Sequence, residues 1–151
     1  MRAVLQRVAR ASVTVDGAVV GEIGAGLLVL VGVGSDDTER DADALADKVV
    51  GLRVFPDDEG KMNRSLAETG GGALVVSQFS LLADIARGRR PSFTRAAAPP
   101  LASTLVDRVA LGIERAGVVV EIGRFGAPMT VELVNPGPVT IVVDTRRGRV
   151  V

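Results

Sequence analysis

The amino-acid sequence predicts one α/β (α+β) domain, in which a mixed β-sheet curls towards a barrel and carries two main helices. Strand-like alternation of polar and apolar residues covers much of the chain. Two longer segments instead space their apolar residues at helical intervals. The sequence of 151 residues contains neither a repeat nor an interdomain linker, so we expect residues 1–151 to form a single domain.

Strands are expected along most of the chain. Residues 3–15 alternate in polarity as a half-buried strand does, and Asp16-Gly17 then forms a typical hairpin turn. Residues 27–33 are an unbroken apolar run, which predicts a central strand buried on both faces. Further strands are expected at residues 18–23, 73–79, 118–122, 129–134 and 139–143.

Two helices are expected between these strands. The first begins at a capping box, and the second opens with two prolines and ends at a glycine. The residues concerned are Asp36 and Glu39 for the first helix, and Pro99, Pro100 and Gly117 for the second. Residues 53–72 are expected to be irregular with at most a short strand, and the polar tail from Arg146 to Val151 is expected to be frayed.

The composition excludes several classes of chemistry. The chain has no cysteine and no histidine, which rules out disulfides, thiolate nucleophiles, Ser-His-Asp triads and most zinc or haem sites. Val29 stands where a third glycine would have to follow Gly24 and Gly26, so the phosphate-binding fingerprint is missing. The acidic pairs near residues 36 and 57 are explained as caps and turns. We therefore expect no metal and no cofactor.

The charge pattern is neutral overall, with one basic segment. A net charge of zero argues against a general polyanion binder. Residues 87–95 nevertheless contain four arginines, within a stretch long enough to be a functional or disordered loop. This bias reflects either the nucleotide composition of the gene or a local phosphate-binding patch. No apolar run approaches the roughly 20 residues of a membrane span, so we expect a cytoplasmic protein without membrane contact.

Two short segments carry the candidate functional residues. The first, at the end of a predicted strand, consists of Ser77, Gln78, Phe79 and Ser80. A serine nucleophile in this segment would need a base, and Asp84 and Glu132 are not spaced as an acid–base pair. The alternative is that these polar groups only satisfy the hydrogen bonds of a turn.

The second segment is the turn around Gly137-Pro138. Its local sequence favours a plain trans hairpin turn, whereas a cis bond would place two carbonyl oxygens side by side as a clamp for an ammonium group. Arg7 is a further candidate, because it interrupts the apolar face of the first strand. A buried arginine needs carboxylate or carbonyl partners, unless a bulge turns it outward.

Several motifs, in order along the chain, resemble those of the D-aminoacyl-tRNA deacylase family. They are Gln6-Arg7-Val8, the segment 24–30, Gly60-Lys61-Met62-Asn63, Ser77-Gln78-Phe79, Arg90-Pro91-Ser92-Phe93, Gly123-Arg124-Phe125 and the Asn-x-Gly-Pro-Val-Thr segment at 135–140. Each motif is weak alone, but the ordered set is highly specific.

The resemblance implies a homodimeric hydrolase, with the fold of that family, that removes D-amino acids and misattached glycine from the 3′ end of tRNA. The Gly137-Pro138 bond is then cis and reaches into the partner's pocket, where its carbonyls hold the substrate ammonium and exclude L side chains. Catalytic and pocket roles fall on Ser77, Gln78, Phe79 and Ser80, and supporting roles on Arg7, Phe125, Asn135 and Thr140. The resemblance favours water attack assisted by the RNA over a protein nucleophile.

The chain departs from the family pattern at two places. Ser80 stands where threonine is more common, and Pro136 stands where a polar residue is more usual. Two rival functions stay open at this point. One is a related editing deacylase with a trans Gly-Pro bond and a different chiral specificity. The other is a non-enzymatic module that binds tRNA or a small ligand through its arginine patch.

Overall fold

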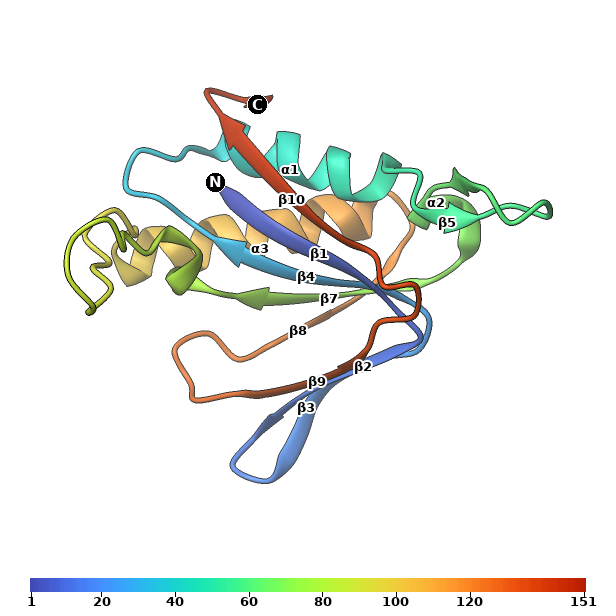
Figure 1. Cartoon of the computed structure of the whole chain (residues 1–151), viewed down its shortest axis with the longest axis horizontal. Helices are drawn as coiled ribbons and strands as arrows, with labels where there is room; N and C mark the ends of the chain where they lie inside the picture. The colour runs from blue at the N-terminus through green and yellow to red at the C-terminus, as the bar shows by residue number, and fades with distance from the viewer.

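The structure, a computed structural model that describes residues 1–151, consists of two main β-sheets and a helical layer (Figure 1). The larger sheet has six strands in the order β11-β10-β1-β4-β7-β8. Its strands are β1 (Arg2–Val8), β4 (Gly26–Gly32), β7 (Gly72–Ser77), β8 (Val119–Ile122), β10 (Thr140–Arg146) and β11 (Arg149–Val150). Strand β1 is antiparallel to both of its neighbours, whereas β4, β7 and β8 are parallel. The prediction of a mixed sheet is confirmed.

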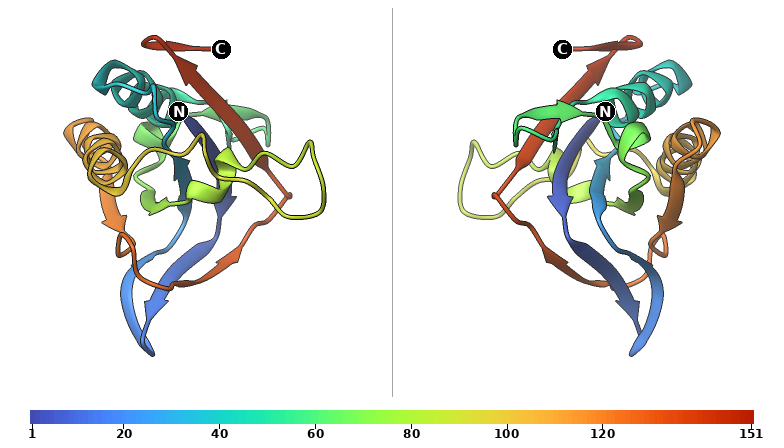
Figure 2. Two further views of the ribbon diagram at one scale, coloured as in Figure 1. Left: turned by 90° about the vertical axis from the view of Figure 1, so that its left-hand side faces the viewer. Right: turned by 90° about the vertical axis from the view of Figure 1, so that its right-hand side faces the viewer.

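The smaller sheet packs against part of one face of the larger one. It contains β3 (Ala18–Ile23), β2 (Arg10–Val15) and β9 (Thr130–Val134), in that order. Buried residues such as Val13 from this sheet and Leu28 and Leu74 from the larger one form a shared apolar cluster. The two sheets curl towards each other without closing, as Figure 2 shows from the side, so the predicted curl is also confirmed.

Helices α1 (Glu39–Gly51) and α3 (Pro99–Arg115) cover the other face of the larger sheet and complete the main core. Helix α3 begins at the predicted prolines. Helix α1 is capped by Thr38 with Asp41, and not by the predicted pair Asp36 and Glu39. The remaining elements are short, namely β5 (Phe55–Pro56), β6 (Met62–Arg64), α2 (Leu66–Thr69) and the 3₁₀ helix η1 (Phe79–Leu82). No helix is long and apolar enough to span a membrane.

The predicted strand 3–15 is wrong in one respect, because the chain leaves the larger sheet at Ala9 and enters the smaller one. Ala3 and Leu5 are buried in the main core, whereas Val8 is buried in the second cluster and Ala9 is exposed. The side-chain alternation therefore changes phase at this corner. Alternation alone cannot reveal such a change, since apolar residues such as Leu5 and Ala11 occupy odd-numbered positions on both sides of it.

The predicted fraying of the C-terminal tail is also wrong. Strand β11 forms a hairpin with β10, and the N–H of Val151 donates to the carbonyl of Asp144 at 2.9 Å. The N–H of Gly148 donates to the Asp41 carboxylate at 2.9 Å, which fixes the hairpin to α1. One oxygen of the Asp41 carboxylate caps α1, and the other accepts the N–H of Gly148, so the same side chain also fixes the C-terminal hairpin.

Candidate active site

The first candidate segment lies at the edge of the larger sheet where the parallel strands β4, β7 and β8 end. Ser77 is the last residue of β7, and the N–H of Gln78 donates to the Val31 carbonyl of β4 at 2.8 Å. The connection that holds Phe125 leaves β8 from the same edge, where the N–H of Gly123 donates to Val75 at 2.9 Å. The carboxyl ends of parallel strands are the usual place for ligands in such sheets.

The side chains of this segment form a small polar and aromatic surface. The Gln78 amide donates to the Ser80 hydroxyl at 2.6 Å. Phe79 is 56% exposed and meets Phe93 edge to face, with the ring centroids 4.8 Å apart. Within the chain, no carboxylate or other base accepts a hydrogen bond from Ser77 or Ser80, so neither hydroxyl has the paired base of an activated nucleophile.

The second candidate segment, residues 135–139, is a corner between the two sheets and not a hairpin turn. Strand β9 belongs to the smaller sheet and β10 to the larger one, so the chain crosses between them here. The crossing runs beside the corner at Ala9, whose N–H donates to Val134 at 2.8 Å. The Gly137-Pro138 peptide bond is cis, as the resemblance implies, and both residues are exposed.

Arg7 holds this Gly-Pro corner from two directions. Its backbone N–H donates to the Val139 carbonyl at 3.1 Å. Its guanidinium is partly buried and donates to the carbonyls of Val54 at 2.7 Å and Pro136 at 3.2 Å. The partners expected of a buried arginine are therefore carbonyl oxygens, and Arg7 links the corner to the chain beyond α1.

Asn135 and Thr140 link the two ends of the corner. The Asn135 side chain accepts the N–H of Val139 at 3.0 Å and donates to the Thr140 hydroxyl at 3.1 Å. That hydroxyl also accepts a hydrogen bond from Gln6 at 3.2 Å. Side chains at both ends of the corner thus restrict its backbone and leave the Gly137 and Pro138 carbonyls outside this network.

The two candidate segments lie at opposite ends of the larger sheet within one chain (Figures 1 and 2). Arg7 pairs with Leu27 at the start of β4, whereas Gln78 bonds Val31 near its end. These four residues of strand correspond to roughly 13 Å, and β1 and β7 lie on either side of β4. One chain alone does not bring the Gly-Pro corner to Phe79.

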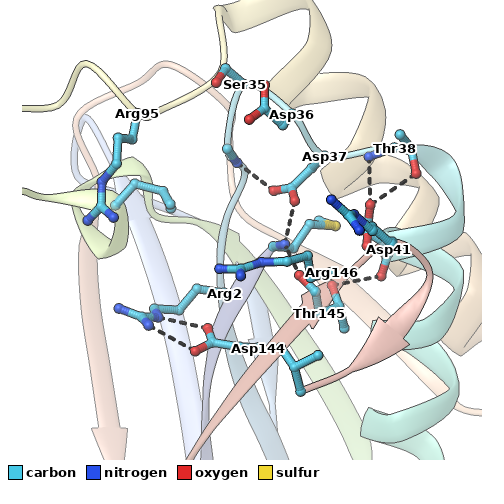
Figure 3. Close-up of a pocket in the computed structure, with 15 residues that line it drawn as sticks. Arg2, Ser35, Asp36, Asp37, Thr38, Asp41, Arg95, Asp144, Thr145 and Arg146 are labelled. Atoms are coloured by element: carbon cyan, nitrogen blue, oxygen red, sulfur yellow. Dashed lines mark hydrogen bonds and ion pairs between the residues drawn. The ribbon is translucent and has the colours of Figure 1, made fainter.

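A polar cavity of about 450 Å³ that sequence reasoning did not foresee lies near η1 and the start of α1 (Figure 3). Two ion pairs lie in its wall. The Met1 ammonium donates to Asp37 at 2.6 Å, and Arg2 forms two bonds of 2.8 Å with Asp144, which lower the pKa of that carboxyl. The arrangement serves to join the two chain ends to the sheet, and none of the predicted site residues lines it.

Asp41, at the wall of this cavity, is almost fully buried. Burial alone would raise the pKa of this carboxyl. Hydrogen bonds from Gly148 and from the backbone and hydroxyl of Thr38 outweigh burial and leave the pKa below its usual value. The structure contains no group of three or more carboxylates placed to bind a metal ion.

Two neighbours of the site were not among the predicted site residues. Gln6 supports Thr140, and Phe93 supports the ring of Phe79. Both lie in motifs that carried the family resemblance, so the signal was present, but their contacts come from strands and loops that are distant in sequence. The Val54 carbonyl accepts a hydrogen bond from Arg7, and no feature of the sequence predicts this contact, because every residue has a carbonyl group.

The fold and the site define a mixed α/β protein with polar residues at the ends of its parallel strands and a braced Gly-Pro corner at the other end of the sheet. The family model described as D-Tyr-tRNA(Tyr) deacylase matches residues 4–144. The chain belongs to this family, which confirms the resemblance found in the sequence.

Individual relatives agree with this assignment. The D-aminoacyl-tRNA deacylase of Roseiflexus castenholzii is 60% identical over 96% of this chain and 92% of its own length. The protein of the same name from Symbiobacterium thermophilum is 57% identical over 97% of each chain. Among solved structures, a c-Myc DNA unwinding element binding protein superposes with a TM-score of 0.90 at 36% identity, covering 97% of this chain and 99% of that one. A probable eukaryotic D-amino acid tRNA deacylase has the same fold, with a TM-score of 0.81 at 21% identity over 93% of this chain and 97% of its own.

Proposed function

We propose that this protein is a D-aminoacyl-tRNA deacylase, which hydrolyses the ester between a D-amino acid, or misattached glycine, and the terminal adenosine of tRNA. Membership of the family supports the reaction class. The observation that carries the chiral specificity is the Gly-Pro corner, whose backbone is held by Arg7 and Asn135 while its carbonyls stay outside that network.

Selectivity in this proposal comes from exclusion by backbone. The carbonyls of Gly137 and Pro138 hold the α-ammonium of the substrate as a cis Gly-Pro clamp, and the wall they form leaves no space for a side chain of L configuration. Glycine has no side chain and is therefore also accepted. A rigid wall discriminates better than an apolar pocket, which separates substrates differing by one methylene by only about 10- to 200-fold.

The hydrolysis itself needs little from protein side chains. Phe79 and Phe125 provide apolar surface for the terminal adenosine, and the Gln78–Ser80 pair lines the ester. Water attacks the ester carbonyl with help from the neighbouring ribose hydroxyl, the ester C–O bond breaks, and the released ribose oxygen takes a proton. Positioning and backbone N–H groups that stabilise the oxyanion supply the rate enhancement, which fits a chain without histidine.

The complete site is composite in this proposal and requires a C2 homodimer. Two observations support it. The Gly-Pro corner and Phe79 lie at opposite ends of the larger sheet, so a site that contains both takes one of them from a second copy. In addition, the sheet face opposite the helices carries an apolar row, in which Val4 pairs with Val142 and Leu30, and Val142 is 59% exposed.

The test is a comparison of D-Tyr-tRNA with L-Tyr-tRNA as substrates at equal concentration. We expect release of D-tyrosine at a rate more than roughly 200-fold above that of L-tyrosine, which exceeds the discrimination of an apolar pocket, together with slow release of glycine from Gly-tRNA. Equal rates on the two tyrosine esters would refute chiral exclusion and favour a related editing deacylase. Binding of tRNA without turnover would favour a non-enzymatic module. The expected cytoplasmic location stays a prediction.

A further inference from the structure

Between η1 and α3 the chain leaves the sheet as a long exposed loop, which stands out from the body in Figure 2. The base of this loop is closed by two hydrogen bonds between Asp84 and Ser92, with N to O distances of 2.7 and 2.9 Å. We call residues 84–92 the arginine loop, because Arg87, Arg89 and Arg90 lie at its exposed tip.

The three guanidinium groups of the arginine loop have no anionic partner in the protein. None of them forms an ion pair, and of the sixteen arginines in the chain only Arg2, Arg64 and Arg108 do. The loop places three unpaired guanidinium groups within four residues. The single carboxylate of the loop is Asp84, and it accepts the N–H of Ala86 at 2.9 Å. On a chain of zero net charge, this loop therefore concentrates unpaired positive charge.

The arginine loop is attached directly beside the strand-end site. Phe93, the residue after the loop, packs edge to face against Phe79. Further along, the carbonyl of Arg95 accepts the N–H of Ser35 at 3.1 Å, and the N–H of Ala97 donates to Val33 at 2.8 Å. The base of the arginine loop is thus anchored next to the proposed pocket for the terminal adenosine.

We propose that the arginine loop binds the phosphate backbone of the double-stranded acceptor stem, an inference that rests on the proposed function. The single-stranded 3′ end enters the pocket at Phe79, so the helical stem begins a few nucleotides outside it, where the loop projects. Guanidinium groups contact phosphates bidentately and without reading bases. The loop therefore increases affinity for any tRNA, while the Gly-Pro corner selects the amino acid.

The experiment compares three proteins, namely the wild type, the variant Arg87→Gln, Arg89→Gln, Arg90→Gln, and a control with the same charge change. The control carries Arg40→Gln, Lys48→Gln and Arg115→Gln, which replace exposed cations of the helical layer that form no ion pair. Dissociation constants for deacylated tRNA, for an acceptor-stem minihelix and for a single-stranded oligonucleotide ending in CCA are measured from 50 to 200 mM KCl. Cleavage of D-tyrosyl-tRNA and of D-tyrosyl-adenosine is measured in parallel.

The slope of log affinity against log salt is negative, and each phosphate contact makes it steeper by about 0.7 to 0.9. The slope of the loop variant should therefore be less steep than that of the wild type by roughly 2 to 3. Between 50 and 200 mM KCl, the affinity for the tRNA and the minihelix should therefore fall by a factor roughly 16 to 64 times larger in the wild type than in the loop variant. The control should keep the wild-type slope. Binding of the single-stranded oligonucleotide and cleavage of D-tyrosyl-adenosine should not change.

An unchanged slope in the loop variant, or an equal loss in the control, would overturn the inference even if the wild type deacylates D-tyrosyl-tRNA. An equal loss on D-tyrosyl-adenosine would also overturn it, since the loop would then act in the pocket. A changed slope in a protein that does not prefer the D ester would refute the proposed function and leave the RNA contact standing. The salt dependence of tRNA binding therefore tests the arginine loop, whereas the preference for the D ester tests the proposed function.

Discussion

At the scale of single residues, Gly137 combines a special backbone conformation with a crowded position. Its φ of +129° lies in a region that residues with a Cβ rarely adopt, and a Cβ there would come within 3.0 Å of the Arg7 guanidinium. A side chain at this position must therefore move either Arg7 or the corner. Both consequences reach the carbonyls that we propose as the ammonium clamp.

We predict that Gly137→Ala lowers kcat/KM for D-aminoacyl-tRNA by about 100-fold, the loss expected when a substrate is displaced by roughly 1 Å. The melting temperature should fall by roughly 2–12 °C, because a strained backbone position costs about 1–3 kcal/mol and each kcal/mol lowers the melting temperature of a chain of this length by about 2–4 °C. Steady-state kinetics and thermal unfolding measure the two effects. The control is Gly17→Ala in the β2–β3 turn, where φ is +79° and no atom lies within 4 Å of the added Cβ. Similar losses of activity in both variants would contradict the role given to the corner.

At the scale of elements, Asp41 joins three parts of the fold. One carboxylate oxygen accepts the N–H and hydroxyl of Thr38 at the start of α1, and the other accepts the N–H of Gly148 in the β10–β11 turn. Its carbonyl also accepts the hydroxyl of Thr145 at 3.2 Å. The helix start and the C-terminal hairpin therefore depend on the same side chain.

We predict that Asp41→Asn destabilises the protein by about 1–3 kcal/mol at pH 7, because buried N–H groups lose an acceptor. The folded pKa of Asp41 is lowered, so its contribution is fully present above the unfolded pKa of about 3.9 and is lost as the pH falls below it. The difference between wild type and variant should therefore shrink from pH 5 to pH 3. Urea unfolding at several pH values measures it, with the exposed Asp47→Asn as control. A difference that does not vary with pH would disprove the linkage.

The sequence predicts the elements better than it predicts their partners. The run at residues 27–33 and the double proline at residue 99 indicate a central strand and a helix start on local grounds, and the structure has both. The phase change at Ala9 and the corner at Gly137 depend instead on which sheet each strand joins. That choice is made by long-range pairing, so the strand–turn–strand pattern predicts a hairpin where the chain in fact changes sheets.

The candidate site divides in the same way. The strand-end position of Gln78 follows from local sequence, and the need of Arg7 for polar partners follows from its place on an apolar face. The identity of those partners, the carbonyls of Val54 and Pro136, does not. Carbonyl groups leave no trace in a sequence, because every residue has one.

At the scale of the whole molecule, the separation of Phe79 from the Gly-Pro corner has a consequence that mixing experiments can test. If each site takes Phe79 from one subunit and Gly137 from the other, Phe79→Ala and Gly137→Ala each inactivate both sites of their own homodimer. A heterodimer of the two variants has one site with both changes and one site with neither. The second site is intact.

We therefore predict that the two inactive variants, unfolded together at equal concentration and refolded, recover about a quarter of the wild-type activity, because half of the dimers are mixed and each has one working site. Each variant refolded alone should stay inactive, and wild type treated in the same way sets the scale. Val142→Arg, which places a charge in the exposed apolar row of the sheet face, should prevent the recovery and give a monomer in sedimentation. If the mixture stays inactive although heterodimers form, each site lies within one chain, and the Gly-Pro corner cannot be the clamp for the ester held at Phe79.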